Sequence, residues 1–138
     1  LPAHCVELEI TESTLLQHIP ATTTTLEKLS ELGAGIALDD FGTGYSSLSY
    51  IKALPVSGLK IDRTFLSGVP DQPRDVSIVR GTLALAHSLG LTVTAEGVES
   101  PAQLSMLEEL GCDRAQGYLL GRPGSPDAAA RRLEAGPR

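Results

Sequence analysis

Polar side chains follow five short β-type runs of the sequence, at or near the point where each run ends. They are Glu9, the pair Asp39 and Asp40, Lys60 with Asp62, Glu96, and Gln116. Carboxylates that converge repel one another unless a cation neutralises them, and their hard oxygens suit Mg²⁺ or Mn²⁺ rather than Zn²⁺. Two such ions, roughly 3.5–4 Å apart, can hold the attacking and leaving oxygens of a phosphodiester. Converging acids would therefore suit a two-metal site that acts on a phosphodiester, whereas each acid taken singly fits a helix cap or a solvated loop charge at least as well.

Lys60 and Asp62 lie two residues apart, so they point to the same side of a strand. A lysine that points into the interior is costly unless it pairs with acids or with phosphate. Lys60 could act beside an attacking water or on the charge that develops on a phosphate. A strand-end ion pair explains the same two residues equally well, and the sequence leaves both interpretations open.

The elements that would position these side chains alternate along the chain. We expect strands at residues 5–10, 35–39, 58–62, 91–96 and 113–118, and helices at 22–32, at 75–89, after Ser100 and after Ser125. The first helix places Leu26, Leu29 and Leu32 on one face, which predicts that they are core residues. Alternating strands and helices indicate an α/β fold around a parallel sheet.

The spread of polar residues over all five strand ends favours a barrel. In (β/α) barrels the catalytic residues come from the ends of several strands at one face, whereas an open doubly wound sheet gathers ligands at one switch point. A complete barrel takes roughly 250 residues and eight strands, and this chain has 138 residues. We therefore expect a partial TIM-like (β/α) barrel of about five βα units. Its open strand edges should make the chain poorly soluble or oligomeric.

Composition excludes several classes of protein. The formal charge of −6 and the pI of about 4.9, without a basic stripe, argue against binding duplex nucleic acid. No apolar run reaches the length of about 18 residues that a membrane span needs, so we expect a cytoplasmic location, free or as part of a membrane-anchored protein. Cys5 and Cys112 are far apart and are expected to be reduced thiols. His4, His18 and His87 share no metal-ligand spacing.

The glycine-rich segment at residues 41–47 suggests two other motifs, and both are incomplete. Asp40-Phe41-Gly42 spells the kinase D-F-G, but no H-R-D precedes it and no A-P-E follows. Gly42-Thr43-Gly44 follows a strand as in dinucleotide folds, but Ser47 stands where G-x-G-x-x-G requires its third glycine. Neither a kinase nor a dinucleotide-binding fold is predicted.

Five linked segments together resemble the EAL domain family in order and spacing, over roughly residues 5 to 125. The segments are Glu9-Ile10-Thr11-Glu12-Ser13, the run from Leu38 to Leu48, Leu59-Lys60-Ile61-Asp62-Arg63, Ala95-Glu96-Gly97-Val98-Glu99, and the run from Gln116 to Pro123. The resemblance implies a modified (β/α) barrel that hydrolyses the bacterial messenger cyclic di-GMP to linear pGpG.

The resemblance also implies roles for single residues. Glu9, Asp39, Asp40 and Glu96 would be metal ligands or metal-site acids for a two-metal Mg²⁺ or Mn²⁺ site, with Glu96 also the general base. Lys60 would contact a metal-bound water, Asp62 and Gln116 would lie near the substrate, and Glu12 and Glu99 would anchor the loop from Asp40 to Ser47. Members of the family pair through this loop, so a homodimer is expected through residues 40–48 and the helix that follows.

The family's Glu-Ala-Leu motif, its metal-binding Asn and its early ligand-binding Arg belong upstream of the segments found here. Residues 1–138 are therefore expected to be the C-terminal part of one EAL domain, inactive alone but active when intact. A GGDEF or sensor domain upstream would be typical of the family. Two alternatives are a receptor that binds cyclic di-GMP without cutting it and a domain used only for dimerisation.

Overall fold

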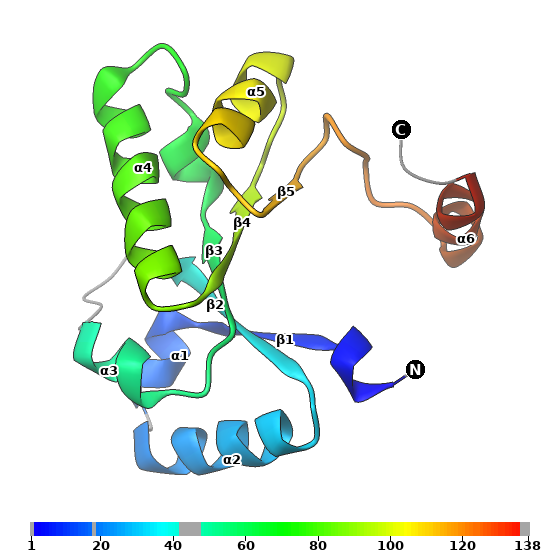
Figure 1. Ribbon diagram of the computed structural model, residues 1–138. Coiled ribbons are helices and arrows are strands. Elements are labelled where there is room, and N and C mark those ends of the chain that lie inside the picture. The colour runs from blue at the N-terminus through cyan, green and yellow to red at the C-terminus, as the bar shows by residue number, and fades with distance from the viewer. Residues whose placement is uncertain (1, 18, 42–47, 136–138) are drawn as a thin grey trace.

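The computed structural model of the protein describes residues 2–17, 19–41 and 48–135 (Figure 1). The strands are β1 (Glu7–Thr11), β2 (Gly35–Phe41), β3 (Gly58–Ile61), β4 (Thr92–Glu96) and β5 (Arg114–Gln116). The α-helices are α1 (Glu12–Gln17), α2 (Ile19–Glu31), α3 (Leu48–Ala53), α4 (Pro73–Ser88), α5 (Pro101–Glu109) and α6 (Pro126–Ala135). Two 3₁₀ turns, η1 (Ala3–Cys5) and η2 (Arg63–Leu66), complete the described elements.

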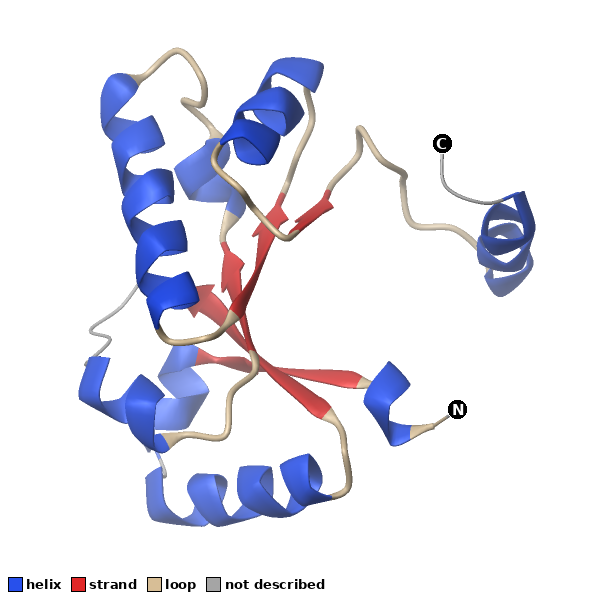
Figure 2. Cartoon of the chain, in the orientation of Figure 1, coloured by secondary structure: helices blue, strands red, loops and turns tan. Residues whose placement is uncertain are grey.

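The five strands form one sheet in the order β1-β2-β3-β4-β5, and every neighbouring pair is parallel. Each strand thus pairs with the next strand in the sequence, and the connections between them carry the helices (Figure 2). Consecutive parallel strands are the strand order of a (β/α) barrel. The predicted α/β class and the five predicted strands are confirmed, with ends that differ by a few residues.

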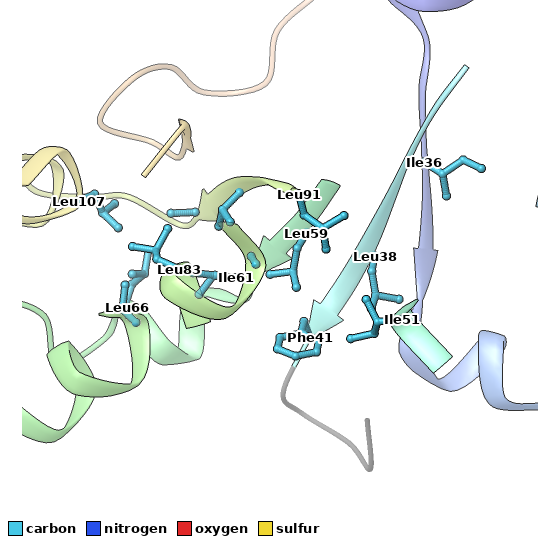
Figure 3. Close-up of a cluster of buried hydrophobic side chains, with 14 of the residues drawn as sticks. Ile36, Leu38, Phe41, Ile51, Leu59, Ile61, Leu66, Leu83, Leu91 and Leu107 are labelled. Atoms are coloured by element: carbon cyan, nitrogen blue, oxygen red, sulfur yellow. The ribbon is translucent and has the colours of Figure 1, made fainter. Parts of the chain in front are cut away.

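The apolar core fills the space between the sheet and the helices on its outer side. Ile36, Leu38, Leu59 and Ile61 are 1–2% exposed and pack with helical residues such as Leu83 (Figure 3). The helices are held by local devices as well. Ser100 and Gln103 form the predicted capping box at the start of α5, which satisfies backbone N–H groups of the first turn.

One expectation about α2 is wrong. Leu26 is buried, but Leu32 is 72% exposed and takes no part in the core. The reason is that α2 ends at Glu31 and the chain then turns at Gly33, whose φ of 93° lies in the left-handed region. Leu32 therefore leaves the helical face on which Leu26 lies.

The structure also contains short elements that periodicity did not predict, namely α1, α3, η1 and η2. The last helix, α6, stands apart from the sheet in Figure 1. Within the described ranges, no helix is long and apolar enough to cross a membrane.

Candidate active site

Side chains of each strand alternate between the two faces of the sheet. In β3, Leu59 and Ile61 point to the apolar core, so Lys60 points to the opposite face. Strand register extends this second face across the sheet, since Lys60 pairs with Thr94 and Glu96 with Gln116. We call this the inner face, and its members include Glu9, Ala37, Asp39, Gly58, Lys60, Thr94, Glu96, Arg114 and Gln116.

Lys60 lies between two carboxylates on the inner face. Its Nζ is 2.6 Å from Glu9 Oε1 and 2.5 Å from Glu96 Oε1, and the residue is 4% exposed. Burial by itself lowers the pKa of Lys60, but the hydrogen bonds to Glu9 and Glu96 outweigh it and leave the pKa raised. The ammonium group therefore stays charged and joins β1 to β4 through β3.

Asp39 and Asp40 lie at an irregularity of β2, where its register with β3 shifts between Leu38 and Phe41. Asp40 has a φ of 57°, a left-handed conformation that aspartate tolerates better than most residues, and its N–H donates to Asp39 Oδ1 at 2.8 Å. Bulges of this kind re-aim side chains beside active sites. The Asp39 carboxylate raises the pKa of Asp40, burial and Asp62 act in the same direction, and Lys60 opposes them. Negative charge is therefore concentrated at the end of β2.

Asp62 has a structural task in addition to any contact with a ligand. Its Oδ1 accepts hydrogen bonds from Thr64 N–H at 2.8 Å and from Thr64 Oγ1 at 2.5 Å, so it is the N-cap of η2. These hydrogen bonds lower the pKa of Asp62. The carboxylate is thus ionised and fixed in direction where β3 ends.

A hollow of roughly 310 Å³ opens beside these residues at the C-terminal ends of the strands. We call it the inner hollow, and it is lined by Asp62, Arg63, Glu96, Gly97, Glu99, Gln116, Gly117 and Tyr118. Gly117 is required here because a Cβ would collide with the backbone of Val98. The predicted residues Asp62, Glu96 and Gln116 thus come together in one concave place.

Residues 1–123 match the family model described as the EAL domain. The chain belongs to the EAL domain family. The resemblance seen in the sequence is confirmed.

Two relatives of this EAL domain sequence are named as cyclic di-GMP phosphodiesterases. The chain is 49% identical over 123 residues to the cyclic di-GMP phosphodiesterase NbdA of Pseudomonas aeruginosa, covering 89% of this chain and 16% of NbdA. It is 51% identical over 122 residues to the bifunctional diguanylate cyclase/cyclic di-GMP phosphodiesterase MucR of the same organism, covering 88% of this chain and 18% of MucR.

Solved structures agree with the fold. The EAL domain of Mycobacterium smegmatis DcpA matches with a TM-score of 0.93 and 47% identity, over all of this chain and 62% of that one. The PaMucR phosphodiesterase in complex with c-di-GMP matches with a TM-score of 0.87 and 47% identity, over 94% of this chain and 52% of that one. The fold is thus part of a TIM-type barrel, and the chain spans only a fraction of its relatives' length.

The acids of this EAL sequence fit divalent cations by their chemistry. The carboxylates of Glu9 and Glu96 converge on one nitrogen atom, and Asp39 and Asp40 crowd each other at the end of β2. All four offer hard oxygen donors. In the described part of the chain, however, no group of three or more acidic, histidine or cysteine side chains is close enough to hold a metal ion. A neighbour of 31% identity, Klebsiella pneumoniae BlrP1, was solved as manganese and calcium complexes with cy-diGMP.

The loop expected to join metal binding to dimerisation falls largely at residues 42–47, outside the described residues. Its two expected anchors, Glu12 and Glu99, differ in burial and in location. Glu12 is 4% exposed at the start of α1, whereas Glu99 is exposed and lines the inner hollow. Their anchoring role stays a prediction.

Apart from two glycines, two residues that line the inner hollow are not among the candidates from the sequence, Arg63 and Tyr118. The Arg122 guanidinium lies over the Tyr118 ring, 4.5 Å from its centroid. Arg63 directly follows Asp62, and Tyr118 follows Gln116 by two residues. Position just past a strand end was therefore the available signal, but the loop directions that bring these residues to the hollow depend on tertiary structure.

Proposed function

We propose that residues 1–138 form the C-terminal part of one EAL domain, and that the complete domain hydrolyses cyclic di-GMP to linear pGpG with Mg²⁺ or Mn²⁺. The observation that carries this proposal is the convergence of Glu9, Lys60 and Glu96 beside Asp39 and Asp40, in a chain about half identical to named cyclic di-GMP phosphodiesterases. Residues 1–138 alone are proposed to be inactive.

In the proposed reaction, water adds across one phosphodiester bond of the ring. The water oxygen joins the phosphorus, the bond from phosphorus to a ribose 3′ oxygen breaks, and that oxygen takes a proton. Glu96 accepts the proton of the attacking water, as general bases do. Lys60 orients the Glu96 carboxylate through the 2.5 Å contact between Nζ and Oε1. It also adds positive charge beside the reacting phosphate. Asp62 and Gln116 orient the substrate in the inner hollow.

Glu9, Asp39, Asp40 and Glu96 would hold the cations. When bound, these ions would supply positive charge to the phosphodiester and make a water more acidic. The repulsion that raises the pKa of Asp40 supports this assignment, because a cation would relieve it.

The test compares this chain with the complete domain, each incubated with cyclic di-GMP and Mn²⁺, and measures pGpG by chromatography. We expect turnover by the complete domain, loss of turnover in its Asp39→Ala variant, and no turnover by residues 1–138. Turnover by residues 1–138 that is lost in their Asp39→Ala variant would contradict the proposed inactivity. A complete domain with its acids present and no turnover would contradict the enzymatic proposal.

A receptor that binds cyclic di-GMP without cutting it is the second candidate. One observation favours it: Lys60 Nζ lies between Glu9 and Glu96, two of the acids that are proposed to hold the cations. Binding of cyclic di-GMP by the complete domain without formation of pGpG, in Mg²⁺ and in Mn²⁺, would select this candidate.

A homodimer through residues 40–48 and α3 is proposed for either function, and sedimentation of the complete domain tests it.

A further inference from the structure

Arg63 lies at the boundary between two hollows. It lines the inner hollow, and it also lines a second hollow of roughly 370 Å³, which we call the outer hollow. The outer hollow is lined by Arg63, Thr64, Ser67, Gly97, Glu99 and Gln103. Among these residues Arg63 is the only one that carries a positive charge.

Several contacts fix the place where the Arg63 side chain leaves the backbone. Asp62 caps η2 through its hydrogen bonds to Thr64. Gly97 has a φ of 72°, and a Cβ at this position would collide with the Cβ of Arg63, so the loop after β4 passes directly against Arg63. Gln103 Nε2 donates to Leu66 O at 2.9 Å and ties the start of α5 to the end of η2. The root of this exposed side chain is therefore held from three directions.

The charge of Arg63 is not taken up by an ion pair. Lys60 contacts Glu9 and Glu96, but no carboxylate of the described residues lies within ion-pair distance of the Arg63 guanidinium. Its attraction to Asp62 is only one of the weaker influences on that carboxylate. A guanidinium held at its root and without a close carboxylate is available to a ligand.

The hollows combine donors and acceptors in a way that suits a purine base better than a phosphate. Phosphate oxygens only accept hydrogen bonds, so the carboxylates of Asp62 and Glu99 would repel a phosphate beside Arg63. Guanine presents O6 and N7 acceptors, which match the arginine fork, next to N–H donors that carboxylates accept. Adenine places an N–H₂ donor where guanine has O6, and a guanidinium cannot accept from it.

We infer that Arg63 contacts one guanine base of the ligand through O6 and N7, and that it makes the site prefer guanine to adenine. The inference rests on the proposed function, because it presumes that cyclic di-GMP binds with its phosphates on the inner face. It assigns Arg63 to base recognition and leaves the reacting phosphate to Lys60 and the acids.

The experiment measures calorimetric affinities of the complete domain for cyclic di-GMP, cyclic di-IMP and cyclic di-AMP in Ca²⁺. Inosine keeps O6 and N7 but lacks the exocyclic amine. Arg63→Met removes the donors at similar length, Arg63→Lys keeps the charge without the fork, and Arg80→Met on α4 is the control. We expect Arg63→Met to weaken cyclic di-GMP and cyclic di-IMP about tenfold and to leave cyclic di-AMP unchanged. The affinity of Arg63→Lys for these two nucleotides should lie between those of the wild type and Arg63→Met.

An equal loss for all three nucleotides would overturn the inference in favour of a phosphate contact. Unchanged affinity for cyclic di-GMP in Arg63→Met would also overturn it. The control variant Arg80→Met is expected to bind all three nucleotides like the wild type. The wild-type protein is measured first, because a wild type that binds none of the three overturns the proposed function and the inference with it. The melting temperature of each variant checks its folding independently of binding.

Discussion

Leu59 and Lys60 are neighbours in β3, yet one lies among apolar side chains and the other between two carboxylates. They are similarly buried, at 2% and 4% exposed, so burial alone does not distinguish them. The difference is the face of the sheet, because successive residues of a strand point in opposite directions. In this molecule the outer face supplies the apolar core, and the inner face carries the groups that could do chemistry.

The inner face itself has two levels. Near the C-terminal ends of the strands, Lys60 joins Glu9 and Glu96; nearer the other end, Arg114 Nη1 contacts Glu7 Oε2 at 3.1 Å. The Lys60 side chain is 5% exposed and its partners Glu9 and Glu96 are 48% and 22% exposed, whereas neither member of the lower pair is buried, with Arg114 at 57% and Glu7 at 34%. Ion pairs gain or lose much more when they are buried. The contacts of Lys60 should therefore contribute more to stability than the ion pair between Arg114 and Glu7.

The largest loss of stability is expected on the outer face. Leu59→Ala removes a side chain from the core and leaves a cavity, so the free energy of unfolding should fall by about 2–5 kcal/mol. Urea denaturation measures this change. The arrangement around Lys60 should survive, so an equally large loss in the free energy of Mn²⁺ binding would show that the two faces are not independent.

Lys60→Met tests the inner face at the neighbouring position. It leaves the carboxylates of Glu9 and Glu96 close together without a cation between them. Both are partly exposed, at 48% and 22% of their side chains, so the expected loss is about 1–2 kcal/mol rather than the full cost of breaking a buried pair. Thermal unfolding with and without Mn²⁺ measures it, and Mn²⁺ should recover part of the loss. A variant as stable as the wild type would show that these acids do not repel one another.

A smaller and pH-dependent effect is expected outside the sheet faces, where Asp113 joins α4 to β4. Its Oδ2 lies 2.8 Å from His87 Nε2 and accepts from Val93 N–H at 2.8 Å; these contacts lower the pKa of Asp113. A lowered carboxyl pKa stabilises the fold above the unfolded value of about 3.9, and the contribution is lost as pH falls through the folded pKa. Asp113→Asn should therefore be less stable than the wild type near neutral pH, and the difference should shrink below about pH 4. Melting temperatures of both proteins measured across this pH range test the prediction. A difference that stays constant with pH would contradict it.

The alternation of faces explains how much the sequence could predict. The five strands, the inner-face acids and the need for Lys60 to find an anionic partner all follow from residue type and period-two spacing. Which acids pair with Lys60 depends on strand register and sheet curvature, which no local pattern contains. Leu32 was misassigned because helical periodicity does not mark the last residue of a helix.

Arg63 shows the other limit of local patterns. Its type and its position after Asp62 are visible in the sequence, but its place between two hollows depends on η2 and on the close approach of Gly97. Gln103, 40 residues beyond Arg63 in the sequence, contacts both neighbouring segments, since its Nε2 donates to Leu66 O and its Oε1 accepts from Glu99 N–H. Residues on strands could therefore be predicted as a group, whereas Arg63 and Tyr118, which lie beyond the strand ends at the same site, could not.

The smallest effect is expected at the lower level of the inner face. Arg114→Gln removes the ion pair with Glu7, and pairs this exposed typically contribute about 0–1 kcal/mol. Arg114→Gln should lower the free energy of unfolding by less than Lys60→Met does. Added salt should reduce the loss in Arg114→Gln further, because exposed charges are screened. Urea denaturation of both variants at low and high salt measures the contrast. If Arg114→Gln instead proved as costly as Lys60→Met, the lower pair would be a brace between the first and last strands, and exposure would be a poor guide to the importance of charges on this face.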